Sequence, residues 1–256
     1  MNLIERFQSL HESDELLLLG NAWDLPSAKA LEQAGFKAIG TTSWGIAASR
    51  GFADGEALDF DIQLGTIKRI VDHVGVPVTA DIESGYGQDD ASIVDNVLKA
   101  ADLGVAGINL EDSLKSEAGM KPIPDQSRLL FNIREALVKR GFGLLYLNAR
   151  TDTYLLPHRD SLGETLNRAR AYAENGASGI FVPGLTNADE IRVVASSVRA
   201  PLNVMALPGL TDCEELRKLG VRRLSLGGSL YRKTFKLLEQ NAAEMMNSRN
   251  VSVLFE

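Results

Sequence analysis

The chain alternates eight short apolar runs with longer segments of helical periodicity, and this alternation limits its possible folds more than any other feature. The apolar runs cover residues 16–20, 38–42, 76–81, 107–111, 143–148, 179–182, 202–205 and 223–226. Near-continuous apolar strands are typical of parallel sheets that are covered by helices on both faces. Helices are expected between the runs, for example over residues 26–33 and 60–73.

Glycine marks the end of several predicted helices, a few residues before the next apolar run. These glycines are Gly35, Gly104, Gly176 and Gly220. Glycine after the last helical residue adopts the left-handed conformation at little cost. The repeated unit and the length of 256 residues predict an α/β fold, a single (β/α)8 TIM-type barrel of parallel strands and outer helices over residues 1–256. Rossmann and flavodoxin-like sheets fit less well, because they use fewer strands and no G-x-G-x-x-G follows the first run.

Composition excludes several classes of partner. A net charge of −7 and a pI near 5.1 argue against nucleic acid, because phosphate binding requires a basic face. The single cysteine, Cys213, excludes an internal disulfide and suits a reducing compartment. No apolar run approaches the roughly 20 residues of a membrane span, and the N-terminus is typical of an amphipathic helix. We therefore expect a cytoplasmic protein without nucleic-acid or membrane partners.

Acidic side chains follow several of the predicted strands, where the active site of a barrel lies. The polar residues at these positions are Asn21, Asp24, Asp81, Glu83, Glu111, Asp112, Asn148, Arg150 and Asp152. Converging carboxylates repel one another unless a cation lies between them. Hard oxygen ligands favour Mg²⁺, with Mn²⁺ as a substitute, and the three histidines lack the spacing of zinc ligands. Any one of these carboxylates is equally well a helix cap, so the hypothesis depends on their coincidence with Arg150.

Three ordered motifs resemble the isocitrate lyase/phosphoenolpyruvate mutase superfamily. Residues 81–87, DIESGYG, are similar to its D-x-D-x-G-[FY]-G signature, with Glu83 in place of the second aspartate. Residues 106–112, AGINLED, resemble A-G-x-x-x-E-D, and residues 149–152 resemble A-R-T-D. Residues 38–48 are similar to the family's strand and turn over the substrate. The likeness extends from about residue 18 to residue 232.

The resemblance implies a metal site. Asp81 would bind Mg²⁺ directly, Glu83 and Glu111 would hold the metal's waters, and Asp54 would belong to the same outer shell. Because glutamate reaches one methylene further than aspartate, Glu83 either ligates directly or shifts the ion. The catalytic residues implied are Arg150, Asp54 and Glu111.

Substrate contacts are implied by the same resemblance. Arg150 would bind the substrate carboxylate or developing negative charge through its planar fork. Further substrate contacts would come from backbone N–H groups around Thr42, Ser43, Trp44 and Gly45, and from Asn203.

The segment after the second motif departs from the family's lyases. Those lyases carry a K-x-C-G-H loop whose cysteine is the general acid, whereas residues 113–124 contain no cysteine. Cys213 lies in a helical segment, where we expect it only to pack, and Gly184 stands where the lyases have a glutamate. Cleavage of isocitrate or methylisocitrate by that machinery is therefore not expected. Lys115 and Lys121 in this segment are candidates for a catalytic role, but the favoured interpretation is that both are exposed and solvated.

These features predict a Mg²⁺-dependent lyase- or hydrolase-type enzyme that cleaves a C–C or C–P bond. Its substrate would be a small 2-oxo acid, oxaloacetate-like or phosphonopyruvate-like, and the reaction would pass through a metal-stabilised enolate. One alternative is a phosphate-binding isomerase or synthase that uses residues 227–229, GGS, although a tight turn also explains these glycines. Another is a catalytically silent barrel that binds a 2-oxo acid.

The resemblance also implies a homo-oligomer, a dimer or tetramer whose C-terminal helices are exchanged between subunits. Residues 230–246 supply generous apolar surface for such an exchange. The apolar residues of this segment are Leu230, Phe235, Leu237, Leu238, Ala242, Met245 and Met246.

Overall fold

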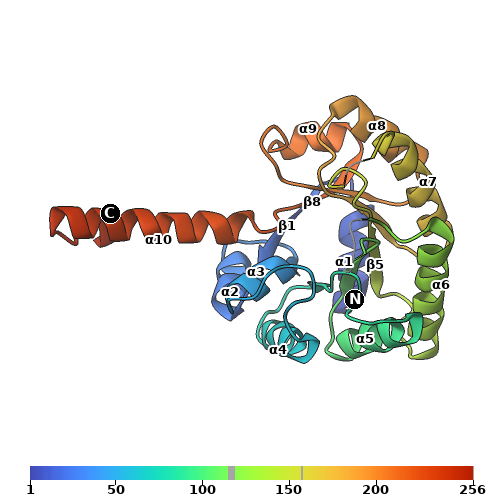
Figure 1. Cartoon of the computed structure of the whole chain (residues 1–256), viewed down its shortest axis with the longest axis horizontal. Helices are drawn as coiled ribbons and strands as arrows, with labels where there is room; N and C mark the ends of the chain where they lie inside the picture. Colours follow the sequence, from blue (N-terminus) through green and yellow to red (C-terminus); the bar gives the residue numbers. More distant parts are fainter. Residues whose placement is uncertain (115–118, 157, 256) are drawn as a thin grey trace.

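Eight parallel strands close into a barrel in which every strand pairs with its neighbour in sequence and β8 pairs with β1 (Figure 1). The computed structural model describes residues 1–114, 119–156 and 158–255. The strands are β1 (Leu17–Ala22), β2 (Ile39–Thr41), β3 (Val78–Asp81), β4 (Gly107–Glu111), β5 (Tyr146–Arg150), β6 (Gly179–Val182), β7 (Leu202–Met205) and β8 (Val221–Ser225). The predicted (β/α)8 barrel is confirmed.

Helices surround the barrel, and the main core lies between them and the strands. They are α1 (Leu3–Glu12), α2 (Leu25–Gln33), α3 (Ser43–Ala48), α4 (Phe60–Val71), α5 (Asp90–Asp102), α6 (Ile123–Lys139), α7 (Ser161–Glu174), α8 (Ala188–Ser197), α9 (Cys213–Lys218) and α10 (Ser229–Ser248), with a 3-10 turn η1 (Ser252–Phe255). Helix α1 covers the N-terminal end of the barrel, where the buried Phe7 packs with Leu19 and Tyr146. The opposite end, at the carboxyl ends of the strands, is left for the site.

The strand boundaries differ from the expected ones in ways that matter for the site. β5 begins three residues later than its apolar run and continues to Arg150, so the arginine is the last residue of a strand. α3 was not expected, and it begins directly after β2 because the Thr42 side chain accepts a hydrogen bond from the N–H of Gly45 (3.2 Å). The residues expected to form a loop over the substrate therefore form the first turn of a short helix.

The four glycines predicted to end helices all have positive φ, between 87° and 103°. Their left-handed conformation is confirmed, and with it the repeated connection that returns each helix to the next strand.

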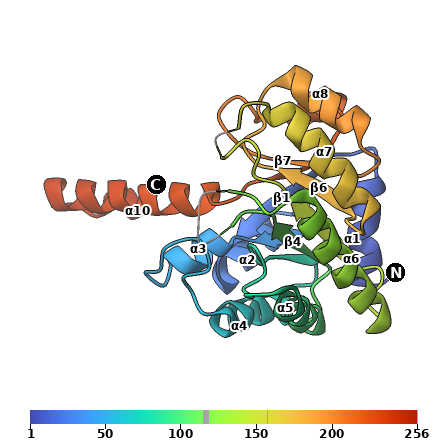
Figure 2. The ribbon, with the colours of Figure 1, turned by 45° about the vertical axis from the view of Figure 1, so that its right-hand side comes forward.

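The last long helix stands apart from the barrel. Figures 1 and 2 both show α10 projecting away from the other helices, and none of its residues is buried. In the described part of the chain, no helix has the length and apolar character required to cross a membrane.

Candidate active site at the barrel mouth

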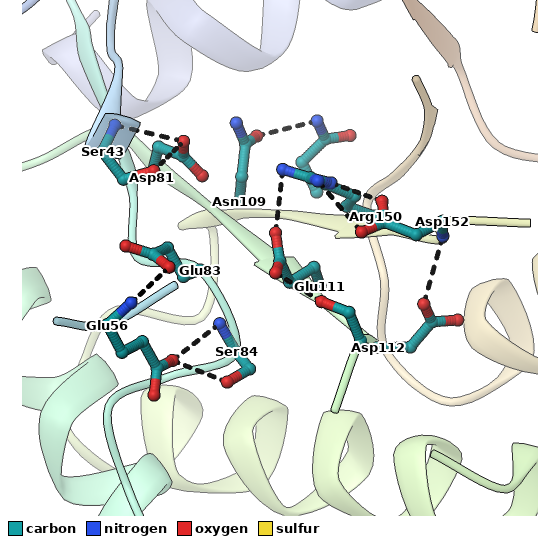
Figure 3. A network of polar contacts seen from close by, with 12 residues as sticks. Ser43, Glu56, Asp81, Glu83, Ser84, Asn109, Glu111, Asp112, Arg150 and Asp152 are labelled. Carbon is teal, nitrogen blue, oxygen red and sulfur yellow. Dashed lines mark hydrogen bonds and ion pairs between the residues drawn. The ribbon is translucent and has the colours of Figure 1, made fainter. Parts of the chain in front are cut away.

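Asp81 is the last residue of β3, and its carboxylate lies at the mouth of the barrel (Figure 3). Its Oδ2 accepts hydrogen bonds from the Ser43 hydroxyl (2.8 Å) and the Ser43 N–H (3.3 Å) at the start of α3. Burial raises the pKa of Asp81; Arg150 counteracts that shift and the nearby Glu111 carboxylate adds to it. Asp81 is thus a desolvated carboxylate at a strand end that a cation would stabilise.

Arg150 connects the ends of β4 and β5. Its Nη1 forms an ion pair with Glu111 Oε2 (2.8 Å), while Nε and Nη2 donate to the two oxygens of Asp152 (2.6 and 3.0 Å). Burial alone would lower the pKa of Arg150, but these two carboxylates raise it above its usual value. A guanidinium has five N–H donors, so after these contacts each Nη retains a hydrogen for a ligand.

The aspartate of the second motif is an anchor for the site. Asp112 is fully buried, and its Oδ2 accepts from Arg168 Nη1 (3.0 Å) and from the Tyr172 hydroxyl (2.7 Å) on α7. Its other oxygen accepts the N–H of Asp152 (3.2 Å). Asp112 therefore holds the backbone of Asp152, whose carboxylate accepts two hydrogen bonds from Arg150.

Glu83, which replaces the family's second aspartate, lies in a turn of unusual conformation. Its φ is +50° and its side chain is 3% exposed. Oε2 accepts the N–H of Glu56 (2.8 Å) and Oε1 accepts the Tyr86 hydroxyl (2.7 Å). The extra methylene thus carries the carboxylate to the loop that precedes α4.

Glu56 returns the contact from that loop. Its Oε1 accepts three hydrogen bonds, from the N–H (3.0 Å) and hydroxyl (2.6 Å) of Ser84 and from the N–H of Tyr86 (3.0 Å). Glu56 was not among the residues predicted from the sequence. Asp54, which was predicted to belong to the outer shell of the metal, is exposed, and no described contact joins it to the carboxylates of the mouth.

Three of the four backbone N–H groups in the predicted substrate cradle at residues 42–45 already have acceptors within the protein. The Thr42 N–H donates to Ala22 O (2.9 Å), and the Ser43 and Gly45 N–H groups have the acceptors given above. Trp44 packs edge-on against Tyr231 of α10 and lies 5.0 Å beneath the Arg232 guanidinium. Asn203 is 1% exposed, and its Nδ2 donates to Val204 O, Arg223 O and Ser225 Oγ. Direct substrate contact by these residues remains a prediction.

The segment that lacks the lyase cysteine contains a buried lysine. Lys115 lies outside the described residues. Lys121 was expected to be solvated, and this is wrong: burial lowers its pKa, and its Nζ is buried without a hydrogen-bond partner among the described residues. Its backbone N–H donates to Asp112 O (2.7 Å), which places it beside the end of β4.

Two other candidates fall outside the site. Cys213 is half-buried on α9 and packs against the core, as expected. The N–H groups of Leu226 and Gly227 both donate to Asn21 Oδ1 (3.0 Å each), and Ser229 N donates to Leu226 O (3.1 Å). These bonds favour a tight turn over a phosphate cradle at residues 227–229.

The oxygen-rich set at the mouth suits a hydrated divalent ion. Among the described residues, no group of three or more His, Cys, Asp or Glu side chains is gathered around a common point. Mg²⁺ usually keeps several waters and binds through one or two carboxylates, so a dense cluster is not required. The desolvated Asp81, which accepts hydrogen bonds from Ser43 and has Arg150 and Arg223 as more distant positive charges, fits such an ion best.

A closed parallel barrel with carboxylates at the carboxyl ends of its strands is typical of (β/α)8-barrel enzymes, whose active sites lie at this end. The phosphoenolpyruvate phosphomutase family profile matches residues 7–246, and the chain belongs to this family. An uncharacterized protein of Mycobacterium tuberculosis is 35% identical over 225 residues, which are 88% of this chain and 83% of the relative. A Burkholderia cenocepacia J2315 structure, provisionally named a lyase/mutase, has a TM-score of 0.91 and 34% identity, over 98% of this chain and 90% of that one.

Other relatives have names that state an activity. A 2-methylisocitrate lyase of Halalkalibacterium halodurans is 30% identical over 78% of this chain and 66% of its own length. An oxaloacetate decarboxylase of Pseudomonas entomophila is 29% identical over 88% of this chain and 78% of its own length. A phosphonopyruvate hydrolase solved with oxalate and Mg²⁺ shares the fold, with a TM-score of 0.86 and 22% identity over 98% of this chain and 89% of that one. The named relatives of the chain in this family include a lyase and a decarboxylase, and the chain is an enzyme of the same family.

Proposed function

We propose that the protein is a Mg²⁺-dependent enzyme that cleaves a C–C or C–P bond in a small 2-oxo acid of the oxaloacetate or phosphonopyruvate type. The observation that carries the proposal is the desolvated Asp81 carboxylate beside the Glu111–Arg150 ion pair at the mouth (Figure 3). Relatives that act on oxaloacetate, and a hydrolase of the same fold that binds oxalate and Mg²⁺, support it.

In this proposal Asp81 would ligate the ion, and Glu111 and Glu83 would orient its waters. A bound Mg²⁺ would polarise the 2-oxo and carboxylate oxygens and so stabilise the negative charge that develops when the neighbouring bond breaks. Arg150 holds the substrate carboxylate with its remaining Nη hydrogens, and Asp152 fixes the plane of the guanidinium.

We assign the proton donor to Lys121. The family's lyases use a cysteine in this segment, and the described residues of it contain none. A lysine whose pKa burial lowers transfers a proton at neutral pH more readily than a solvated one. Lys121→Met should lower kcat about a hundredfold or more with little change in oxalate affinity, whereas Lys99→Met on α5 should change neither. Equal rates in the two variants would remove Lys121 from the mechanism.

The function is tested by a turnover screen of 2-oxo and 2-hydroxy dicarboxylates and phosphonopyruvate, each with and without Mg²⁺. Calorimetric titration of Mg²⁺ and then oxalate into the wild type and Arg150→Lys accompanies it. The variant keeps the charge but loses the fork, so oxalate affinity should fall while Mg²⁺ affinity changes little. A wild type that binds oxalate with Mg²⁺ yet turns over none of these compounds would indicate a silent binding barrel and contradict the proposal.

A further inference from the structure

The interior of the barrel below the mouth is polar, and a buried arginine lies at its centre. Barrel interiors are usually filled by branched aliphatic side chains. Here Arg223 on β8 is fully buried, and no carboxylate of the described residues forms an ion pair with it. Its neighbour Arg222 points outward and lies 3.8 Å from Asp14. Because side chains alternate along a strand, one of two successive arginines faces the barrel interior.

Arg223 closes a ring of hydrogen bonds across this interior. Nη2 donates to Asn109 Oδ1 (3.2 Å) and Nε donates to Ser225 Oγ (3.2 Å). Asn148 Nδ2 donates both to Asn109 Oδ1 (2.9 Å) and to Asn203 Oδ1 (3.1 Å). Ser225 Oγ and Asn203 Oδ1 are 3.1 Å apart, which completes the ring. We call these five residues the interior ring.

The interior ring joins strands that the backbone does not join. Backbone pairing links each strand only to its two neighbours, whereas the Arg223–Asn109 bond links β8 to β4 on the opposite side of the barrel. The Asn148–Asn203 bond links β5 to β7 across β6. Asn109 precedes Glu111 by two residues on β4, and Asn148 precedes Arg150 by two residues on β5. The ring therefore lies one inward-facing position below the ion pair of the mouth.

A buried cation without a carboxylate partner is unfavourable for stability. Burial lowers the pKa of Arg223 to about 10, and its Nη1 has no hydrogen-bond partner among the described residues. Transfer of an unpaired charge to the interior costs free energy that an aliphatic side chain of similar volume would not. Stability alone thus gives no reason for an arginine here. Two contributions remain, the positive charge that it places near Asp81 and the geometry that its hydrogen bonds impose on the strands.

We propose that Arg223 is a positioning residue that, through the interior ring, fixes the separation of β4 and β5 from the opposite wall and so holds Glu111 and Arg150 in place. The catalytic consequence rests on the function proposed above. Misplacement of a binding group by about 1 Å can cost on the order of a hundredfold in rate. Loss of the ring should therefore weaken substrate binding and turnover without removing any residue that touches substrate.

The test compares Arg223→Met with Arg222→Met, an adjacent arginine outside the ring. We expect both to fold and to bind Mg²⁺, but Arg223→Met should bind oxalate about tenfold more weakly and exchange the backbone amides of residues 107–112 and 146–152 faster. Arg223→Lys keeps the charge, but a single nitrogen cannot span Asn109 and Ser225, so it should resemble the methionine variant. Full recovery by lysine would show that charge alone matters and would overturn the ring.

Asn109→Leu breaks the same cross-barrel bond from its other end. If the ring operates as one unit, the double variant Arg223→Met/Asn109→Leu should lose little more oxalate affinity than either single variant. The single variant Asn109→Leu also tests the ring if Arg223→Met fails to fold. Amide exchange is measured without ligand, so it tests the ring independently of the proposed function. Unchanged exchange in the single variants would contradict the positioning role of the interior ring. A wild type that binds no oxalate contradicts only the proposed function.

Discussion

Asp81 has the properties of a residue that serves binding at the expense of stability. Burial and the neighbouring Glu111 carboxylate raise its pKa, and among the residues that the structure describes only Ser43 donates hydrogen bonds to it. We expect Asp81→Ala to lose Mg²⁺ binding and turnover, while its melting temperature without metal stays level or rises. Asp89→Ala, which removes the N-cap of α5, should show the reverse, with unchanged Mg²⁺ binding and a loss of about 1 kcal/mol. Calorimetry measures Mg²⁺ binding by the two variants, and thermal melts measure their stability. Normal Mg²⁺ binding by an Asp81→Ala protein that melts many degrees lower would make Asp81 structural.

His11 makes stability depend on pH. It is 2% exposed under the barrel and stacks on Tyr146 (3.9 Å). Burial, with the charge of Arg223 adding to it, lowers its pKa from 6.5 to about 3. The folded protein therefore keeps His11 neutral while the unfolded chain takes up a proton below pH 6.5. The contribution of neutral His11 to the free energy of unfolding is fully present above pH 6.5. It is lost as the pH falls from 6.5 towards 3, by at most about 1.4 kcal/mol per pH unit.

Denaturant unfolding at pH 7.5 and 5.5 measures this effect. Between pH 7.5 and 5.5 the free energy of unfolding of the wild type should fall by about 1.4 kcal/mol more than that of His11→Gln. His73→Gln is the matched control, because His73 also contacts the carbonyl four residues earlier (2.8 Å) but lies on the surface. It should retain the pH dependence of the wild type. An identical loss in His11→Gln would mean that His11 is protonated in the folded protein.

The turn after β3 depends on Glu56 for its shape. Glu83, Gly85 and Tyr86 all have positive φ (50°, 107° and 53°), which is unfavourable for the two that are not glycine. Three hydrogen bonds to one oxygen of Glu56 hold this turn. Glu56→Ala should therefore speed amide exchange over residues 83–87 and weaken Mg²⁺ binding several-fold, whereas Asp61→Ala on the exposed face of α4 should do neither. Unchanged exchange would mean that the turn is held by its own sequence.

The elements were predicted from the sequence more completely than the contacts between them. Apolar runs and helix-ending glycines identified the eight strands, because burial on both faces and chain reversal leave local patterns. The motifs likewise predicted Asp81, Glu111 and Arg150 at strand ends. Glu56 was missed because its hydrogen-bond partners lie about 28 residues away in the sequence. Lys121 was misjudged because the burial of its Nζ depends on the tertiary structure. The interior ring was missed because an arginine in an apolar run has no periodic signal of its own.

At the scale of the whole molecule, α10 carries apolar side chains that the other described residues do not bury. Its first turns are anchored by Tyr231, which contacts Trp23, Trp44 and Phe235 with ring centroids 4.4–5.3 Å apart. Beyond this anchor Leu237, Leu238 and Met246 are each more than half exposed. Contiguous apolar surface on a projecting helix is typical of a subunit interface. We therefore propose a homo-oligomer, a dimer or tetramer, in which α10 packs on a second copy.

Light scattering at micromolar concentration tests this proposal, and a monomeric wild type would refute it. Leu238→Glu should shift the mass towards the monomer, because a carboxylate buried at the interface without a partner costs several kcal/mol. Lys236→Glu makes a charge change on the same helix at a basic position and should leave the mass unchanged.

The aromatic anchor also connects α10 to Trp44 beside the mouth, so dissociation should loosen the rim of the site. We accordingly expect the Leu238→Glu variant to lose oxalate affinity on dilution over the same concentrations at which it dissociates. The wild type should lose oxalate affinity only at far lower concentration. Oxalate affinity that does not change with concentration in the variant would show that the mouth is complete within one chain.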